Sequence, residues 1–161
     1  MKTDQFYMNK AVEQASKANS IDEVPIGAVL VDQQGVIIAQ GYNQVEKKQT
    51  QVAHAEMLVL QKAAKKMQTW RLLNTTLYVT VQPCMMCLGA LYLSRVARVV
   101  YGAQSLKFGI SIDKAITSGI YKNLSMSLEY MEYKKAKEVL QIFFQKKRRM
   151  EHVQKGRVSK N

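Results

Sequence analysis

The chain has 161 residues, 47% of them hydrophobic, and its 24 Lys and Arg against 12 Asp and Glu give a formal net charge of +12. This length and composition predict one domain with a buried core and exclude an intrinsically disordered protein. The chain has no run of about 18 apolar residues, and its start does not have the form of a secretory signal. We therefore expect a cytoplasmic protein with no membrane partner.

The positive charge is unevenly distributed along the chain. Residues 145–161 contain seven Lys or Arg and one Glu, a net charge of +6. We predict a domain over residues 1–150 and a basic, frayed tail over residues 151–161. As a lone feature such a tail is best explained as solubilising, but a basic tail on a basic chain favours a polyanionic partner, nucleic acid before an anionic membrane surface.

The first third of the chain predicts a helix, a hairpin and a second helix. Apolar residues recur at helical spacing over residues 3–19. Two short apolar runs, residues 25–32 and 36–41, flank the turn sequence QQG and predict two buried antiparallel strands. Residues 53–67 have an apolar stripe opposite lysines, which indicates a second amphipathic helix.

The middle of the chain predicts a β-α-β unit. A strand over residues 76–81 is followed by a third helix over residues 83–94, opened by a proline, and by a strand over residues 98–102. This order requires parallel strands joined by a right-handed crossover. The third helix is apolar nearly all round, so we expect it to be covered on both sides, in part by a second subunit.

The remainder completes the predicted fold. Residues 105–124 are irregular with one short helix at most, residues 125–131 alternate like a strand, and residues 132–149 form a closing helix. The sum is an α/β protein: a three-layer α/β/α sandwich around a mixed five-stranded sheet.

Both cysteines of the chain, Cys84 and Cys87, form a C-x-x-C pair at the start of the third predicted helix, and His54 and Glu56 lie at the start of the second. Each of these helices follows a strand, so both N-termini can lie at one edge of the sheet, where helix dipoles favour a thiolate. Residues three apart on a helix share a face, so both sulfurs can bind one ion together with the imidazole.

Two thiolates and one imidazole suit Zn²⁺ and leave its fourth position to water, whose pKa can fall to about 7. We predict His54, Cys84 and Cys87 as the metal ligands of a hydrolytic site, with Glu56 moving the proton of the water. The alternatives are a closed structural site completed by His152 and a redox pair of cysteines. Both leave Glu56 without a role.

These residues spell AHAE and PCMMC, which resemble the H-x-E…P-C-x-x-C signature by which zinc nucleobase deaminases are defined. More narrowly, the chain resembles the bacterial tRNA-specific adenosine deaminases from EVPIGAVLVD, through GYN, LYVTVQPCMMC and RVVYGA, to FFQKKRR. The resemblance implies a cytidine-deaminase-like fold, one Zn²⁺ per subunit, a homodimer and a tRNA anticodon stem-loop as partner. It implies attack of a zinc-bound hydroxide on C6 of the flipped-out wobble adenine, giving inosine.

The resemblance also implies substrate-binding residues. Asn43 matches an asparagine that contacts the flipped-out base, and Val24 and Pro25 match the wall of the base pocket. Phe144 and the basic residues after it, among them Arg148, match a closing helix near the flanking nucleotides.

The residues alone leave two of these roles open. The amide of Asn43 can read a purine edge, but a turn residue after a strand explains it equally well. Phe143 and Phe144 cannot both face the core from one helix, so either one stacks on a base or a neighbour buries both.

Two positions depart from the family pattern. Gln82 stands before Pro-Cys where the family usually has Glu, which removes a negative charge near the metal. Ser105 stands where the family often has an acidic residue in a substrate-side loop. Two other functions therefore stay open: a free nucleobase or nucleoside deaminase acting on guanine or cytosine, and a non-catalytic RNA-binding module with structural zinc.

Overall fold

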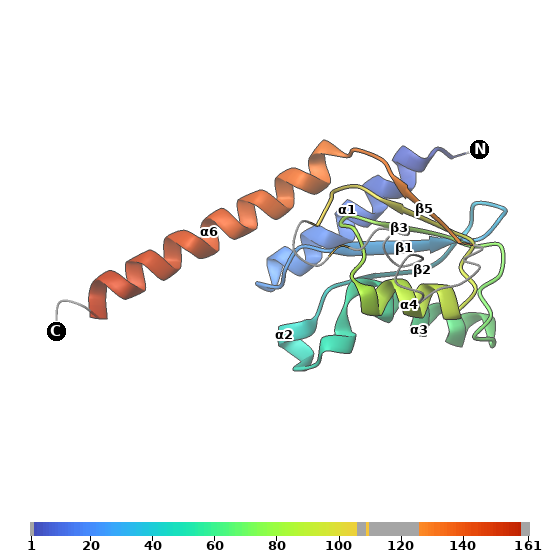
Figure 1. Cartoon of the computed structure of the whole chain (residues 1–161), viewed down its shortest axis with the longest axis horizontal. Helices are drawn as coiled ribbons and strands as arrows, with labels where there is room; N and C mark the ends of the chain where they lie inside the picture. The colour runs from blue at the N-terminus through green and yellow to red at the C-terminus, as the bar shows by residue number, and fades with distance from the viewer. Residues whose placement is uncertain (1, 106–108, 110–125, 159–161) are drawn as a thin grey trace.

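The computed structural model describes residues 2–105, 109 and 126–158, and the side chains within this set as far as residue 153 (Figure 1). The irregular segment expected over residues 105–124 lies almost wholly outside the described residues. All the other predicted helices and strands lie within them.

The described residues form a five-stranded sheet in the order β2-β1-β3-β4-β5. Strand β1 pairs antiparallel with both β2 and β3, whereas β3 pairs parallel with β4, and β4 pairs parallel with β5. The mixed sheet, the hairpin and the parallel β-α-β unit confirm the sequence prediction. The strands are Gly27–Val31 (β1), Ile37–Tyr42 (β2), Thr76–Val79 (β3), Arg98–Tyr101 (β4) and Ser127–Tyr130 (β5).

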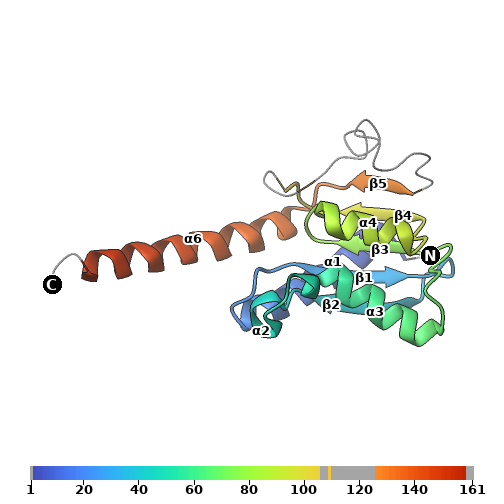
Figure 2. The same ribbon diagram turned by 60° about the horizontal axis from the view of Figure 1, so that its bottom comes forward.

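Helices cover both faces of the sheet (Figure 1). Helix α1 lies on one face against β1, β2 and β3, and α3 and α4 lie on the other, while α6 leaves the body beside α1 and projects away from it in both ribbon views (Figures 1 and 2). The helices are Asp4–Ser20 (α1), Val45–Lys48 (α2), Gln51–Ala53 (η1), Ala55–Met67 (α3), Met85–Leu93 (α4) and Lys134–Val158 (α6).

Alternation along β1 explains the three layers. Ala28 and Leu30 point into a core cluster that also contains residues of α3 and α4, whereas Val29 and Val31 point into a second cluster formed with α1. Successive side chains of a strand face opposite sides of the sheet, so a strand that is apolar at every position must be covered twice.

An ion cluster joins the start of α1 to the sheet. The Arg98 guanidinium at the start of β4 donates to Asp4 at 2.8 Å and to Glu129 of β5 at 2.6 Å. Tyr78 of β3 donates its hydroxyl proton to Asp4 at 2.6 Å. The hydrogen bonds from Arg98 hold the pKa of both carboxyl groups below their ordinary values.

The structure differs from the prediction at several boundaries. Helix α4 begins at Met85, so Pro83 and Cys84 precede it, and the short helices α2 and η1 were not expected. Helix α6 continues to Val158, beyond its predicted end at residue 149.

Gly27 on β1 generates a stability prediction, because α1 packs directly on it: an added Cβ would lie 2.1 Å from the carbonyl oxygen of Ala11. We expect Gly27→Ala to lower the free energy of unfolding by about 3 kcal/mol or more, since the backbone must move. Gly41→Ala on β2 is the control and should cost less, since the closest atom to its Cβ would be a Val59 methyl at 3.2 Å and the other neighbours lie at ordinary contact distances. Denaturant unfolding of both variants tests this, and equal losses would contradict it.

Candidate active site

Strand direction brings two helix N-termini to one edge of the sheet. Both β2 and β3 run antiparallel to β1, so they point the same way and their carboxyl ends lie at the same edge. Strand β2 leads through α2 and η1 into α3, and β3 leads into α4. His54 immediately precedes α3, and Cys84 immediately precedes α4.

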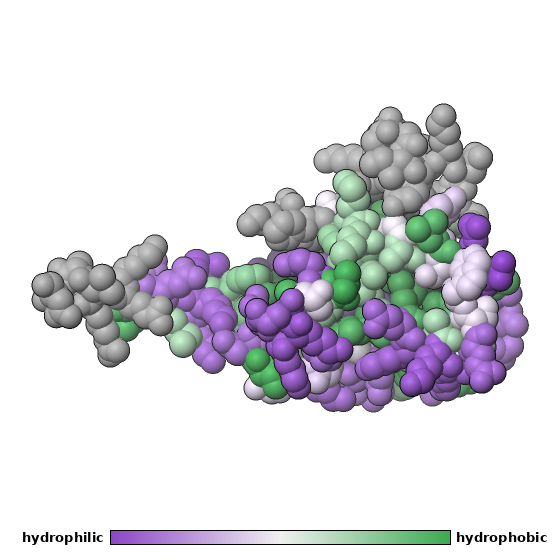
Figure 3. Space-filling view, turned by 90° about the horizontal axis from the view of Figure 1, so that it is seen from below, coloured by the Kyte–Doolittle hydropathy of each residue, from purple (hydrophilic) through white to green (hydrophobic). Residues whose placement is uncertain are grey.

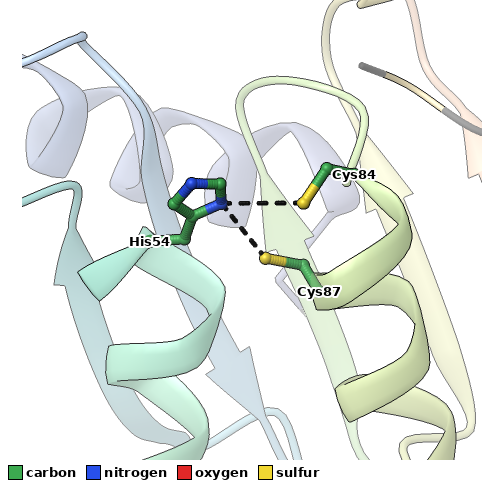
Figure 4. A group of neighbouring side chains, drawn as sticks. All are labelled: His54, Cys84 and Cys87. Carbon is green, nitrogen blue, oxygen red and sulfur yellow. Dashed lines mark hydrogen bonds between the residues drawn. The ribbon is translucent and has the colours of Figure 1, made fainter. Parts of the chain in front are cut away.

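The structure brings the three predicted ligand side chains together (Figure 4). Their ligand atoms all lie within 4.8 Å of one another. The Nδ1 atom of His54 lies 3.4 Å from the Cys87 sulfur and 3.7 Å from the Cys84 sulfur. His152 is exposed on α6 and is not part of this group, which removes the structural four-ligand alternative within the described part of the chain.

His54 and Cys84 occupy the N-cap positions of their helices without capping them. Each N-cap carbonyl accepts the first helical hydrogen bond, from Leu58 at 3.1 Å and from Leu88 at 2.9 Å. Neither side chain makes a capping hydrogen bond, although Ser, Thr, Asp or Asn at an N-cap stabilises a helix by about 1 kcal/mol. Both side chains therefore remain available to an ion.

The two thiols of the site have very different pKa values. A hydrogen bond from the Cys87 thiol, with a further contribution from His54, lowers the pKa of Cys84 to about 4. The same hydrogen bond raises the pKa of Cys87, and the hydrogen bond with Cys84 raises the pKa of His54. The Cys84 sulfur is thus a thiolate at neutral pH, the form that binds metal ions.

Glu56 lies in the first turn of α3 and is 4% exposed. Burial raises the pKa of its carboxyl group, while the charge of His54 and a hydrogen bond with Cys87 act in the opposite direction. These interactions place Glu56 beside the three-residue group. A carboxyl group whose pKa is raised toward neutrality is suited to accept and return a proton.

Backbone hydrogen bonds link the predicted pocket residue Asn43 to the start of α3. Asn43 follows β2; its backbone N–H donates to Ile26 at 2.9 Å, and the next residue donates to Ala53, the neighbour of His54, at 3.0 Å. Pro25 is buried and Val24 is half-buried. Hydrogen bonds thus tie this loop to the start of α3, and Asn43 is buried at 4% exposure.

Glu23 was missed by the sequence analysis. It is 1% exposed, and its carboxylate accepts from the Asn43 side-chain amide at 3.0 Å and from the Lys47 backbone at 2.7 Å. An acidic residue in a loop before a proline is normally solvated, so no sequence signal marks it as buried. Its position directly before the predicted pocket wall was the only available hint.

The two phenylalanines of α6 differ in exposure. Phe143 is 5% exposed, whereas Phe144 is 41% exposed. Lys147 forms an ion pair with Asp22 at 2.5 Å, which attaches α6 to the loop that carries Val24 and Pro25. Phe144 is therefore the ring available for contact, and Arg148 is exposed on the same helix.

The two departures from the family pattern contact each other. The side-chain oxygen of Gln82 accepts from the backbone N–H of Ser105 at 3.3 Å. A carboxylate could accept the same hydrogen bond, so Gln82 preserves this contact while it removes a negative charge and places an NH₂ donor where the family usually has a second acceptor oxygen.

Comparisons with known proteins agree with the geometry. The family model for MafB19-like deaminases matches residues 2–148. The chain is 53% identical over 111 residues to a tRNA-specific adenosine deaminase of Bacillus subtilis, covering 69% of this chain and 68% of that protein. It is 41% identical over 156 residues to a tRNA-specific adenosine deaminase of Haemophilus influenzae, covering 95% and 90%.

Solved structures share the fold. One, from a study of A-to-I editing by tRNA:A34 deaminases at the wobble position of transfer RNA, is 32% identical with a TM-score of 0.74, covering 84% of this chain and 99% of that one. A guanine deaminase from Bacillus subtilis is 31% identical with a TM-score of 0.63, covering 82% and 86%. The expected cytidine-deaminase-like fold is confirmed.

The unequal thiols give a testable prediction. In metal-stripped protein, iodoacetamide should alkylate Cys84 down to about pH 5, because the pKa of Cys84 lies near 4, whereas an ordinary thiol reacts only near its pKa of about 8.5. Cys87, with no exposed surface, should be spared. Mass spectrometry of the labelled sites across pH measures this. His54→Ala should shift the Cys84 profile to higher pH, and preferential labelling of Cys87 would contradict the prediction.

Proposed function

Because this chain belongs to the MafB19-like deaminases, and among them to the bacterial tRNA-specific adenosine deaminases, we propose that it is a hydrolase that converts adenosine to inosine at the wobble position of a tRNA anticodon. The observation that carries the proposal is the convergence of His54, Cys84 and Cys87 beside the buried Glu56. The reaction adds one water and releases one ammonia, so it needs an activated water and a group that moves protons.

The donor set fits one Zn²⁺ per subunit. Two sulfurs and one imidazole nitrogen are typical zinc ligands, and the Nδ1 atom of His54 lies 3.4 Å and 3.7 Å from the two sulfurs, separations that suit ligands of one ion. Three protein ligands would leave the fourth coordination position of the zinc to a water molecule. When bound, Zn²⁺ would lower the pKa of water there to about 7 and so supply a nucleophile at neutral pH.

Glu56 would move the protons. Its buried carboxylate would take one proton of the attacking water and deliver it to N1 of adenine, and would then carry the second proton, from the new C6–OH group, to the leaving N6 as the C6–N6 bond breaks. The new C6–O bond and the released ammonia complete the exchange. The raised pKa of Glu56 favours such a role, because the group must hold the proton between the two transfers.

The remaining predicted residues would bind the RNA. The target base has to leave its stack, which costs least in a single-stranded loop such as an anticodon loop. Val24, Pro25 and Asn43 would line its pocket, and Phe144 would stack on a flanking base. Arg148 and its basic neighbours on α6 would bind phosphates, so affinity should fall steeply with salt.

Helix α4 supports a homodimer. Its nine residues contain no charged side chain, and Met85, Met86 and Leu93 are exposed on it. Figure 3 shows a hydrophobic patch on the face of the molecule that carries α3 and α4. A second copy of the chain would bury this patch, as the apolar sequence of the helix led us to expect.

The family match over residues 2–148 supports a single deaminase domain over residues 1–150, with residues 151–161 as a basic extension. No helix among the described residues has the length and apolar character needed to cross a membrane. Since the proposed substrate is tRNA, we place the enzyme in the cytoplasm.

Replacement of Glu56 tests the proposal. Glu56→Ala should lower the rate of inosine formation on an anticodon stem-loop with wobble adenosine at least about a hundredfold, since it removes the proton carrier. Zinc content, measured by atomic absorption, should be unchanged, because Glu56 is not among the grouped ligands. A variant that still forms inosine at the wild-type rate would refute the role of Glu56.

The same assay separates the alternatives. Wild-type protein should act on the stem-loop and not on free adenosine, guanine or cytosine. Activity on a free base alone would favour the free-base deaminase, and zinc and RNA binding without any inosine would favour the non-catalytic module.

Phe144 gives a second prediction. Phe144→Ala should lower kcat/KM for the stem-loop about tenfold, because stacking of one base on an aromatic ring contributes about 1–3 kcal/mol. Ile142→Ala is the matched control: it removes a side chain that is 63% exposed on the same helix. Equal effects of the two changes, in parallel kinetic measurements, would mean that the ring has no stacking role.

A further inference from the structure

The loop that carries the pocket wall contains a buried carboxylate without a cation. Glu23 is 1% exposed, and it belongs to none of the ion pairs found among the described residues. Its Oε1 accepts from the backbone N–H of Lys47 at 2.7 Å, and its Oε2 accepts from Nδ2 of Asn43 at 3.0 Å. Burying a carboxylate with no cation is strongly unfavourable unless hydrogen bonds satisfy it, so these two bonds are what permits the burial of Glu23.

Asn43 is held by one end of its amide. The residue is 4% exposed, and Nδ2 donates to Glu23. Within the described part of the chain nothing donates to Oδ1, yet no side-chain polar atom there is both buried and unpartnered. Oδ1 must therefore reach accessible space. The backbone bonds to Ile26 and, through the next residue, to Ala53 place Asn43 beside the His54 group.

We propose that Glu23 is a positioning residue that holds the Asn43 amide with its oxygen toward the target nucleotide. The inference rests on the proposed function and adds a determinant of substrate choice to it. An asparagine amide can turn by 180° and exchange its oxygen and nitrogen at little steric cost. A carboxylate only accepts, so it selects the orientation with Nδ2 toward itself, and Asn43 then presents an acceptor to a donor on the nucleotide.

The same bonds predict what Glu23→Gln does. The Lys47 N–H can only donate, so the glutamine must keep its oxygen on that side. Its NH₂ group then faces Nδ2 of Asn43, donor against donor. The Asn43 amide relieves the clash by turning, and the atom offered to the nucleotide changes from acceptor to donor. One isosteric change at a residue away from the reacting atoms should thus invert the hydrogen-bond character of the pocket.

The test measures kcat/KM for inosine formation on the anticodon stem-loop, with zinc content and melting temperature for every variant. Glu23→Gln should lower kcat/KM at least about tenfold, because a buried donor or acceptor is left unmatched, and should keep the zinc. Glu46→Gln is the matched control, since it makes the same chemical change on an exposed side chain of α2 and should leave kcat/KM unchanged.

A double variant that exchanges the amide and the carboxylate between positions 23 and 43 distinguishes loss of the proposed hydrogen bond from general damage to the fold. In Glu23→Gln with Asn43→Asp, the glutamine NH₂ donates to the aspartate, whose second oxygen again faces the nucleotide, so most of the activity should return. Asn43→Asp alone sets two carboxylates against each other and should be worse than the pair. In an Asn43→Ala background, Glu23→Gln should have no further effect on kcat/KM.

Three outcomes would overturn the inference: wild-type kcat/KM in Glu23→Gln, an exchanged pair no better than Glu23→Gln, or the full Glu23→Gln loss in the Asn43→Ala background. A wild-type enzyme that forms no inosine would instead refute the proposed function. A stem-loop with a 2′-deoxy target identifies the donor that Asn43 meets: the Glu23→Gln loss disappears if the donor is the ribose 2′-hydroxyl and persists if it is the adenine amino group.

Discussion

The direction of two strands determines where chemistry can occur in this protein. Because β1 runs antiparallel to both β2 and β3, the two outer strands of this trio end at one edge and deliver α3 and α4 there. One helix brings an imidazole and the other brings two sulfurs, from positions thirty and thirty-three residues apart in the chain. If β3 ran the other way, the cysteines would lie at the opposite edge from His54, and no ion could contact both.

The site is formed at the expense of local stability. His54 and Cys84 occupy N-cap positions where Ser or Asp would stabilise each helix, and neither side chain makes the capping bond. Glu56 is buried where its charged form is disfavoured, and Glu23 is buried nearby without a cation. The core on both faces of the sheet offsets these costs, because Leu30 and Leu77 on the α3 and α4 face, and Met8 and Val29 on the α1 face, have no exposed surface.

The loop between α1 and β1 contacts both the basic helix α6 and Asn43. Asp22 binds Lys147 of α6, whereas Glu23, the next residue, binds Asn43. The side chains of these adjacent residues thus point in different directions, Asp22 toward α6 and Glu23 toward Asn43. The positive φ of 61° at Asp22 accompanies this divergence and is a conformation that Asp tolerates better than most residues. The loop therefore joins the two regions that we propose bind the RNA backbone and the target base.

The sequence by itself determined the layers and marked the candidate metal-binding residues, because each signal is a pattern within a single element: alternation in β1, helical periodicity in α3, and the spacing of Cys84 and Cys87. That these residues meet depends on the directions of β2 and β3. Only the tertiary structure decided the partner of Asn43, which ring of α6 is exposed, and how far that helix extends. Those features depend on contacts between residues distant in the chain, such as Lys147 with Asp22, and on burial that no local pattern encodes. Glu23 is the clearest case, since an acidic loop residue becomes a buried acceptor only when β2 and α2 pack around it.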